Sequence, residues 1–137
     1  MEADRDGNPQ RVIVVLDTNA LMMPAQFRID LFSELQNLLG SYEPVVLEEV
    51  TRELEGISGG HGKDAGAARL GLEISRQCRN EPSGMEGDSV DERIAGYARK
   101  HRGFVVTNDR GLRNRLLGEG VPVISLKNQR KLGIIRR

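Results

Sequence analysis

The 137-residue sequence contains few cysteine, histidine and aromatic residues. Its single cysteine, Cys78, excludes an intramolecular disulfide and indicates a reducing compartment such as the cytoplasm. Neither His61 nor His101 stands at zinc-ligand spacing from the other or from Cys78. No apolar run approaches the length of a membrane span. Residues 1–10, MEADRDGNPQ, lack an apolar stretch and are expected to form a flexible tail rather than a secretory signal, with 11–137 as a single domain.

The formal net charge is zero, but the charges are unevenly distributed. Residues 1–92 carry 18 Asp and Glu against 8 Lys and Arg, whereas residues 93–137 carry 2 acids against 12 bases. An acid-rich part joined to a basic part is typical of a metal-holding site beside a nucleic-acid contact. The alternative is that folding mixes the charges and leaves no basic patch.

Short apolar runs alternate with segments of helical periodicity along the chain. The expected strands are 11–16, 44–47, 103–109 and 121–125, and the linker 80–88 has room for a further brief strand. The expected helices are 28–39, a segment after residue 47, 64–79, 89–101 and 110–118; Ser89 and Glu92 form a capping-box pattern. This alternation predicts an α/β fold, a three-layer α/β/α sandwich around a parallel sheet.

Two of the predicted strands end in an aspartate: VIVVLDTN gives Asp17, and GFVVTND gives Asp109. Each aspartate alone is equally consistent with a turn residue or a helix N-cap. In open parallel sheets, however, ligands bind beyond the carboxyl ends of the strands. Two carboxylates at that edge therefore indicate a site.

Helix geometry selects two further acids. Glu53 lies at the border of the apolar stripe of its helix, whereas Glu48, Glu49 and Glu55 are expected to point toward solvent. The stripe consists of Leu47, Val50, Leu54 and Ile57. Asp91 flanks the apolar stripe of the helix predicted at 89–101. Because Asp91 lies in the first turn of that helix, its negative charge also interacts favourably with the helix dipole.

The four acids, Asp17, Glu53, Asp91 and Asp109, come from different elements of a fold that brings them to one edge. Two carboxylates about 5 Å apart repel by about 3 kcal/mol at an effective dielectric of 20, so such a cluster requires a cation. Oxygen ligands favour Mg²⁺ or Mn²⁺. These ions at a sheet edge serve phosphate chemistry.

Four segments resemble, in order, the acidic motifs of the PIN-domain ribonucleases: LDTNAL (16–21), VTRELEG (50–56), VDERIAGYA (90–98) and VVTNDRGL (105–112). The resemblance covers the chain from about residue 11 onward. It implies a roughly five-stranded parallel sheet and metal-dependent endoribonuclease activity. It assigns metal binding and catalysis to Asp17, Glu53, Asp91 and Asp109, and supporting polar roles to Asn19 and Thr107.

The expected substrate is RNA, with a basic group of residues as candidates to hold its backbone: Arg110, Arg113, Arg115, Lys127, Arg130 and Lys131. The resemblance leaves two settings open, ribosomal-RNA processing with an assembly partner and a toxin with its antitoxin; the basic C-terminal end favours the first. A homodimer is compatible with either setting. Two other functions stay open: a haloacid-dehalogenase-type phosphatase, which would carry a second aspartate where Asn19 stands, and a non-catalytic RNA-binding scaffold.

Overall fold

The computed structural model describes residues 11–82 and 89–136, so the expected tail at 1–10 lies outside the described residues. Within these ranges the strands are β1 (Val12–Leu16), β2 (Tyr42–Leu47), β3 (Arg79–Glu81), β4 (Phe104–Val106), β5 (Val123–Lys127) and β6 (Lys131–Ile135). The helices are α1 (Thr18–Phe27), α2 (Leu31–Leu39), α3 (Glu48–Ser58), α4 (Gly62–Ser75), α5 (Val90–Lys100) and α6 (Arg110–Gly118).

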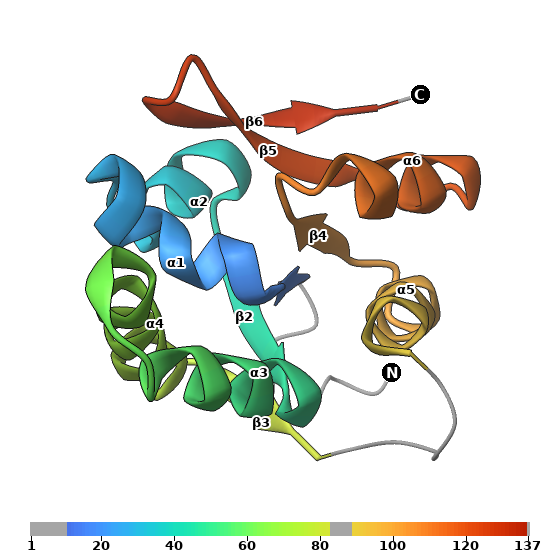
Figure 1. The fold of residues 1–137 in the computed structure, drawn as a ribbon. Coiled ribbons are helices and arrows are strands. Elements are labelled where there is room, and N and C mark those ends of the chain that lie inside the picture. The colour runs from blue at the N-terminus through green and yellow to red at the C-terminus, as the bar shows by residue number, and fades with distance from the viewer. Residues whose placement is uncertain (1–10, 83–88, 137) are drawn as a thin grey trace.

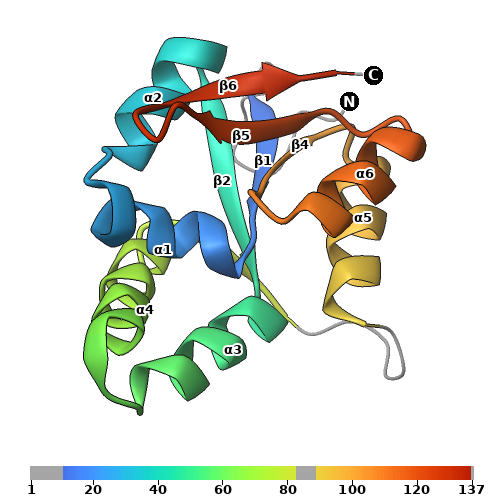
Figure 2. The same ribbon diagram turned by 45° about the horizontal axis from the view of Figure 1, so that its top comes forward.

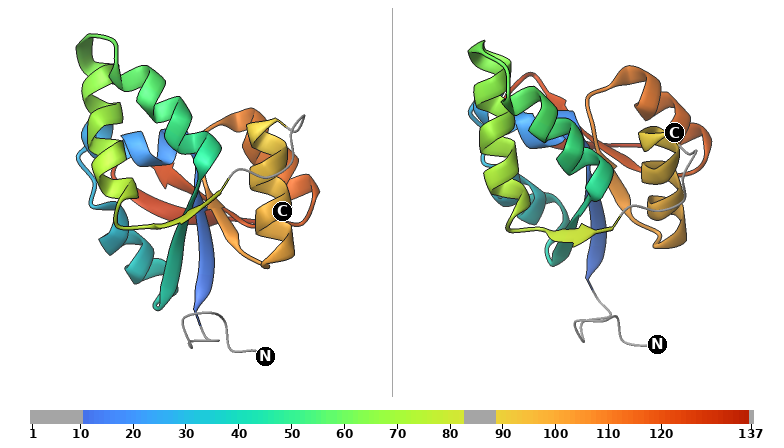
Figure 3. Two further views of the ribbon diagram at one scale, coloured as in Figure 1. Left: turned by 90° about the horizontal axis from the view of Figure 1, so that it is seen from below. Right: turned by 60° about the horizontal axis from the view of Figure 1, so that its bottom comes forward.

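The strands form one sheet in the order β3-β2-β1-β4-β5-β6. Helices α1–α4 lie on one side of this sheet, and α5 and α6 lie on the other (Figures 1 and 3). Strands β1 and β4 are rich in valine because both of their faces are covered, and Val14, Val15 and Val105 are fully buried. The expected three-layer α/β/α sandwich is confirmed. No helix in the described ranges is both long and apolar enough to cross a membrane.

The sheet differs from the expected five parallel strands at its C-terminal edge. Strand β6 runs antiparallel to β5, and together they form a hairpin beside α2 (Figure 2). The turn between them has positive φ at Asn128 and Gln129, as a tight hairpin requires. Glutamine rarely occupies this conformation, which is why the sequence does not reveal the turn. The linker from residue 80 does contain a brief strand, β3.

Helix α1 is absent from the sequence-based expectation. It begins directly after β1 and contains Pro24, a residue that normally ends a helix and therefore hides this one. Arg28, with φ of 55°, ends α1, so the helix expected at 28–39 begins only at Leu31, after Asp30 as N-cap. At α5 the capping box formed by Ser89 and Glu92 is confirmed.

The strand order reverses between β1 and β4, because the chain moves outward from β1 through β2 to β3 and then returns to β4 on the other side. Ligands of open α/β sheets bind at this point, beyond the carboxyl ends of the strands. β1 is followed there by Asp17, and β4 by residues 107–109. The backbone of Asp17 extends the pairing, donating from its N–H to the carbonyl of Val106 at 3.4 Å.

Close packing of α4 on α1 gives a first prediction. A methyl group at Gly71 would lie 2.9 Å from the carbonyl oxygen of Leu21, whereas a methyl group at Gly66 would meet only the end of the Arg69 side chain, at 3.9 Å. We expect Gly66→Ala to stabilise the protein by up to about 1 kcal/mol through helix propensity. Gly71→Ala should destabilise it by about 1–3 kcal/mol. Urea unfolding measures both, and equal stabilities would contradict this packing.

Candidate active site

A cavity of about 520 Å³ opens at the point where the strand order reverses. Its lining contains all four acids selected from the sequence: Asp17, Glu53, Asp91 and Asp109. They come from the end of β1, from α3, from the first turn of α5 and from the residue preceding α6. Thr18, Asn19, Ser89, Val90, Ile94 and Leu112 complete the lining. The structure therefore brings these carboxylates to one cavity.

Asp17 is the most buried of the four, with 5% of its surface exposed. Its Oδ1 accepts a hydrogen bond from the Ala20 N–H at 2.7 Å, and its carboxylate is hydrogen-bonded to the side chain of Thr107. Burial raises the pKa of Asp17 to about 7, the two hydrogen bonds oppose the rise, and the charges of Asp109 and Asp91 add to it. The surroundings of Asp17 therefore make its ionised form less stable, in free energy, than it would be in water.

Three of the acids lie at helix N-termini. Asp17 caps α1, and Asp109 caps α6 by accepting from the Leu112 N–H at 2.7 Å. Asp91 lies in the first turn of α5. Both strand-end aspartates therefore act as helix N-caps, the alternative considered from the sequence, and both also line the same cavity. Each helix dipole favours the negative charge at its end.

Asp91 is exposed, but the other acids influence it. Partial burial raises its pKa, the charges of Asp109 and Glu53 add to the rise, and Arg115 opposes it. Glu53 is also exposed, and its Oε1 accepts a hydrogen bond from the Thr18 hydroxyl at 2.6 Å. The cavity thus has a deep acid on the sheet and shallower acids on the helices.

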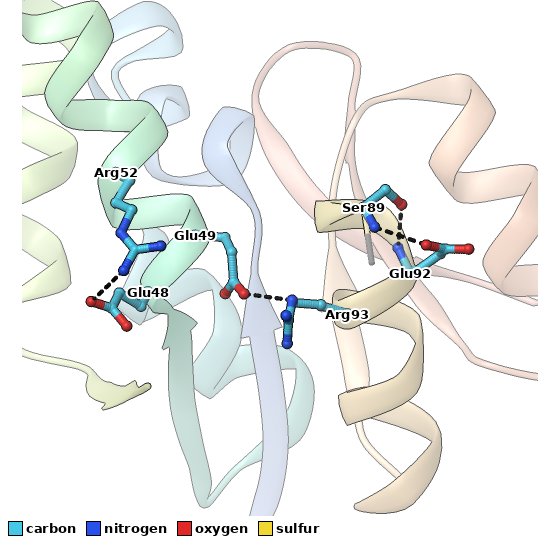
Figure 4. A network of polar contacts seen from close by, with 6 residues as sticks. All are labelled: Glu48, Glu49, Arg52, Ser89, Glu92 and Arg93. Atoms are coloured by element: carbon cyan, nitrogen blue, oxygen red, sulfur yellow. Dashed lines mark hydrogen bonds and ion pairs between the residues drawn. The ribbon is translucent and has the colours of Figure 1, made fainter. Parts of the chain in front are cut away.

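The expectation that Glu49 points toward solvent is wrong. Its side chain is 13% exposed, and its Oε2 lies 2.6 Å from Nε of Arg93, which is 10% exposed. Figure 4 shows this ion pair joining α3 to α5. Glu48, by contrast, pairs at 3.0 Å with Arg52 of its own helix, and both side chains are largely exposed.

A set of hydrogen bonds fixes the loop after β4. The hydroxyl of Thr107 accepts from the Asp109 N–H at 3.0 Å, and Asn19 Oδ1 accepts from the Asn108 N–H at 3.0 Å. Asn108 in turn accepts from the Leu126 N–H at 2.9 Å. Sequence reasoning missed Asn108 and Thr18, although both lie within the motifs LDTN and TND. Their place within these motifs was the only signal in the sequence. Their hydrogen-bond partners lie far away along the chain, so the sequence alone does not reveal these contacts.

The six basic candidates lie in two places. Arg110, Arg113 and Arg115 belong to α6; Lys127, Arg130 and Lys131 belong to the β5–β6 hairpin. Arg115 is bonded to Glu119 at 3.1 Å, and Arg99 also pairs with Glu119. Folding therefore neutralises some of the C-terminal basic charge, while all three hairpin residues stay exposed.

The acids do not form a finished ligand cage. Within residues 11–82 and 89–136, no three His, Cys, Asp or Glu side chains stand so that they could hold a metal ion as they are. The acids are nevertheless close enough for their charges to act on one another. A cation entering the cavity would meet carboxylates carried by four separate segments of the chain.

Comparison with known proteins gives relatives across the chain. A family model described as "PIN like domain" matches residues 14–130. Ribonuclease VapC9 of Archaeoglobus fulgidus is 30% identical over 133 residues, covering 96% of each chain. The rRNA-processing protein fcf1 of Schizosaccharomyces pombe is 30% identical over 122 residues, covering 85% of this chain and 60% of that protein.

Solved structures agree with these relatives. The structure of the PIN domain endonuclease Utp24 superimposes with a TM-score of 0.78 and 28% identity, covering 93% of this chain and 94% of that one. A domain of a functionally unknown protein from Methanocaldococcus jannaschii gives a TM-score of 0.59 at 19% identity, a likeness of fold alone.

The buried carboxyl group of Asp17 gives a prediction about pH. Its pKa is about 7 in the folded protein and about 3.8 when it is free of the fold, so the folded state binds the proton more tightly. Its contribution to stability is present below about pH 4 and is lost as the pH rises through about 7, by about 4 kcal/mol. In Asp17→Asn, which keeps a helix-capping oxygen, this loss should disappear. Urea unfolding from pH 4 to pH 8 in EDTA measures the free energy of unfolding of both proteins. If it changes with pH equally in the wild type and in Asp17→Asn, the raised pKa of Asp17 is contradicted.

Proposed function

The chain belongs to the PIN-like domain family, and on that premise we propose that it is a metal-dependent endoribonuclease hydrolysing phosphodiester bonds of RNA. One observation supports this most strongly. In the described part of the chain, none of the four cavity acids forms an ion pair with a lysine or arginine, whereas Glu48, Glu49 and Glu119 all do. Four carboxylates that line one cavity and form no ion pair with lysine or arginine are suited to an external cation.

Mg²⁺ or Mn²⁺ fits this donor set because the side chains that face the cavity offer carboxylate and amide oxygens. Asp17, Glu53, Asp91 and Asp109 would hold it. When bound, the cation would polarise the scissile phosphate and neutralise its charge. Asp17 and Asp109 supply oxygens at positions fixed by backbone N–H groups. Thr18, the residue next to Asp17, donates a hydrogen bond to Glu53 and restrains its side chain.

The basic residues of α6 and the hairpin would bind the RNA backbone. Arg110 follows Asp109 directly, so a phosphate bound there lies beside the acids. Lys127, Arg130 and Lys131 extend basic charge along the same carboxyl edge of the sheet. With three Phe and two Tyr in the chain, base stacking contributes little, and phosphate contacts carry the affinity.

The remaining alternatives are less well supported. Asn19 stands where a haloacid-dehalogenase-type phosphatase would need its second aspartate, and its side chain is used to hold the loop at Asn108. A non-catalytic RNA-binding scaffold would have no need of the four acids. The cleavage assay below separates it from an enzyme.

The proposed setting is ribosomal-RNA processing, in the cytoplasm, with a ribosome-assembly partner. The relative fcf1 is named an rRNA-processing protein, and Utp24 is described as a PIN domain endonuclease. The basic C-terminal hairpin also suits a large RNA. A toxin controlled by an antitoxin is the second candidate, because VapC9 matches this chain over 96% of both lengths. A small antitoxin encoded beside this gene would favour the toxin.

Cation-dependent cleavage tests the activity. Single-turnover cleavage of a structured RNA should require Mg²⁺ or Mn²⁺ and stop in excess EDTA. Asp17→Asn and Glu53→Gln should each lower the cleavage rate by at least about 100-fold, because each removes a proposed ligand charge. Glu55→Gln, an exposed change on the same helix as Glu53, should stay within a few-fold of wild type.

Two results would contradict this proposal: full cleavage in EDTA, or an Asp17→Asn variant as active as Glu55→Gln. Melting temperatures provide a second readout. Mn²⁺ should raise the Tm of the wild type more than that of Asp17→Asn.

The hairpin gives a prediction about salt. Replacing Lys127, Arg130 and Lys131 with glutamine should weaken RNA binding and reduce the slope of log affinity against log salt by about 0.7 for each lost phosphate contact. The double variant Lys63→Gln/Lys100→Gln removes exposed charges elsewhere and should change the slope little. Fluorescence anisotropy from 50 to 300 mM salt measures the slopes. An unchanged slope in the triple variant would place the hairpin outside the RNA path.

A further inference from the structure

The two helices that carry Glu53 and Asp91 pack on different parts of the fold. Helix α3, which carries Glu53, packs on α4, α1 and β2, whereas α5, which carries Asp91, packs on β1 and β4. The charges of Glu53 and Asp91 repel each other across the cavity. A direct contact between the two helices would oppose their separation.

The ion pair between Glu49 and Arg93 is placed to do this. Glu49 lies one turn before Glu53 on the same side of α3, and Arg93 lies in the same first turn of α5 as Asp91. The oxygen and nitrogen are 2.6 Å apart, and both side chains are almost completely covered. Such a pair tolerates little change in geometry, because displacement would leave a buried charge without its partner.

We propose that the Glu49–Arg93 ion pair is a positioning element that sets the separation of Glu53 and Asp91, and thereby the width of the acidic cavity. This inference rests on the proposed function only in assuming that the separation matters for cation binding. Neither residue needs to touch the cation or the RNA. Both act through the helices that carry the two acids.

The capping box strengthens the proposal, because it fixes the first turn of α5 from its other side. Ser89 Oγ accepts from the Glu92 N–H at 3.1 Å, and Glu92 accepts from the Ser89 N–H at 2.8 Å. Arg93 follows directly and donates toward α3 (Figure 4). The capping box and the ion pair thus act together on the turn that carries Asp91.

A distance measurement tests the proposal without cation or RNA. Spin labels on Glu55→Cys in α3 and Lys100→Cys in α5, both exposed positions, report the separation of the helices by pulsed EPR. Burial raises the pKa of the Cys78 thiol to about 12, so labelling is directed to the introduced cysteines. Glu49→Gln should broaden the distance distribution and shift it to longer values. The charge swap Glu49→Arg/Arg93→Glu should restore it.

The matched control is the exposed pair on the same helix. Glu48→Gln/Arg52→Gln removes an ion pair of 3.0 Å without touching α5, and should leave the distance unchanged. Mn²⁺ affinity, measured by its EPR signal, should fall by about tenfold in Glu49→Gln and recover in the swap. If Glu49→Gln fails to fold, Arg93→Lys, which keeps the charge but loses the planar guanidinium, carries the test.

An unchanged helix separation in the folded Glu49→Gln or Arg93→Lys variant would overturn the proposal, whatever the cleavage activity. A changed separation with unchanged Mn²⁺ affinity would overturn the link to the cation site. Failure of the wild type to cleave RNA would instead contradict the proposed function, and would leave the distance measurement to decide the positioning role. A fall in the cleavage rate with an unchanged KM for RNA would agree with positioning of the acids.

Discussion

The buried carboxyl group of Asp17 is the constraint on which the site depends. Its place at the end of a central strand removes it from water, which raises its pKa to about 7. The neighbouring structure compensates in part: Ala20 donates from the first turn of α1, and Thr107 bonds to it from the end of β4. The same Thr107 hydroxyl accepts from the Asp109 N–H, so one side chain joins the two strand-end aspartates.

The parallel topology makes this concentration of charge unavoidable. Strands that reverse their order between β1 and β4 direct both following aspartates to one edge, and right after them the chain begins helices whose dipoles favour negative charge. Without a cation, the arrangement lowers stability as the carboxyl group of Asp17 ionises. The fold therefore accepts a local loss of stability where the proposed chemistry requires charge.

The sequence allowed the strand-end aspartates to be located because each follows a short apolar run that suits only a covered strand. Strand β6 and helix α1 could not be located this way. A non-glycine hairpin turn at Asn128–Gln129 and an internal Pro24 contradict the local preferences that such predictions use. Glu49 was misjudged for a different reason. The periodicity of α3 identifies its own core side, but Glu49 is covered by Arg93, a residue far along the chain whose position the local pattern does not reveal.

The cavity combines acids held by backbone N–H groups with acids on the surfaces of two helices. Asp17 and Asp109 are held by backbone N–H groups of the helices that they cap, so their positions follow the sheet. Glu53 and Asp91 are exposed side chains on helices anchored elsewhere. In the role proposed above, the ion pair one turn before Glu53 sets the separation of these two helices, which gives Glu49 a role that its neighbours Glu48 and Glu55 do not share.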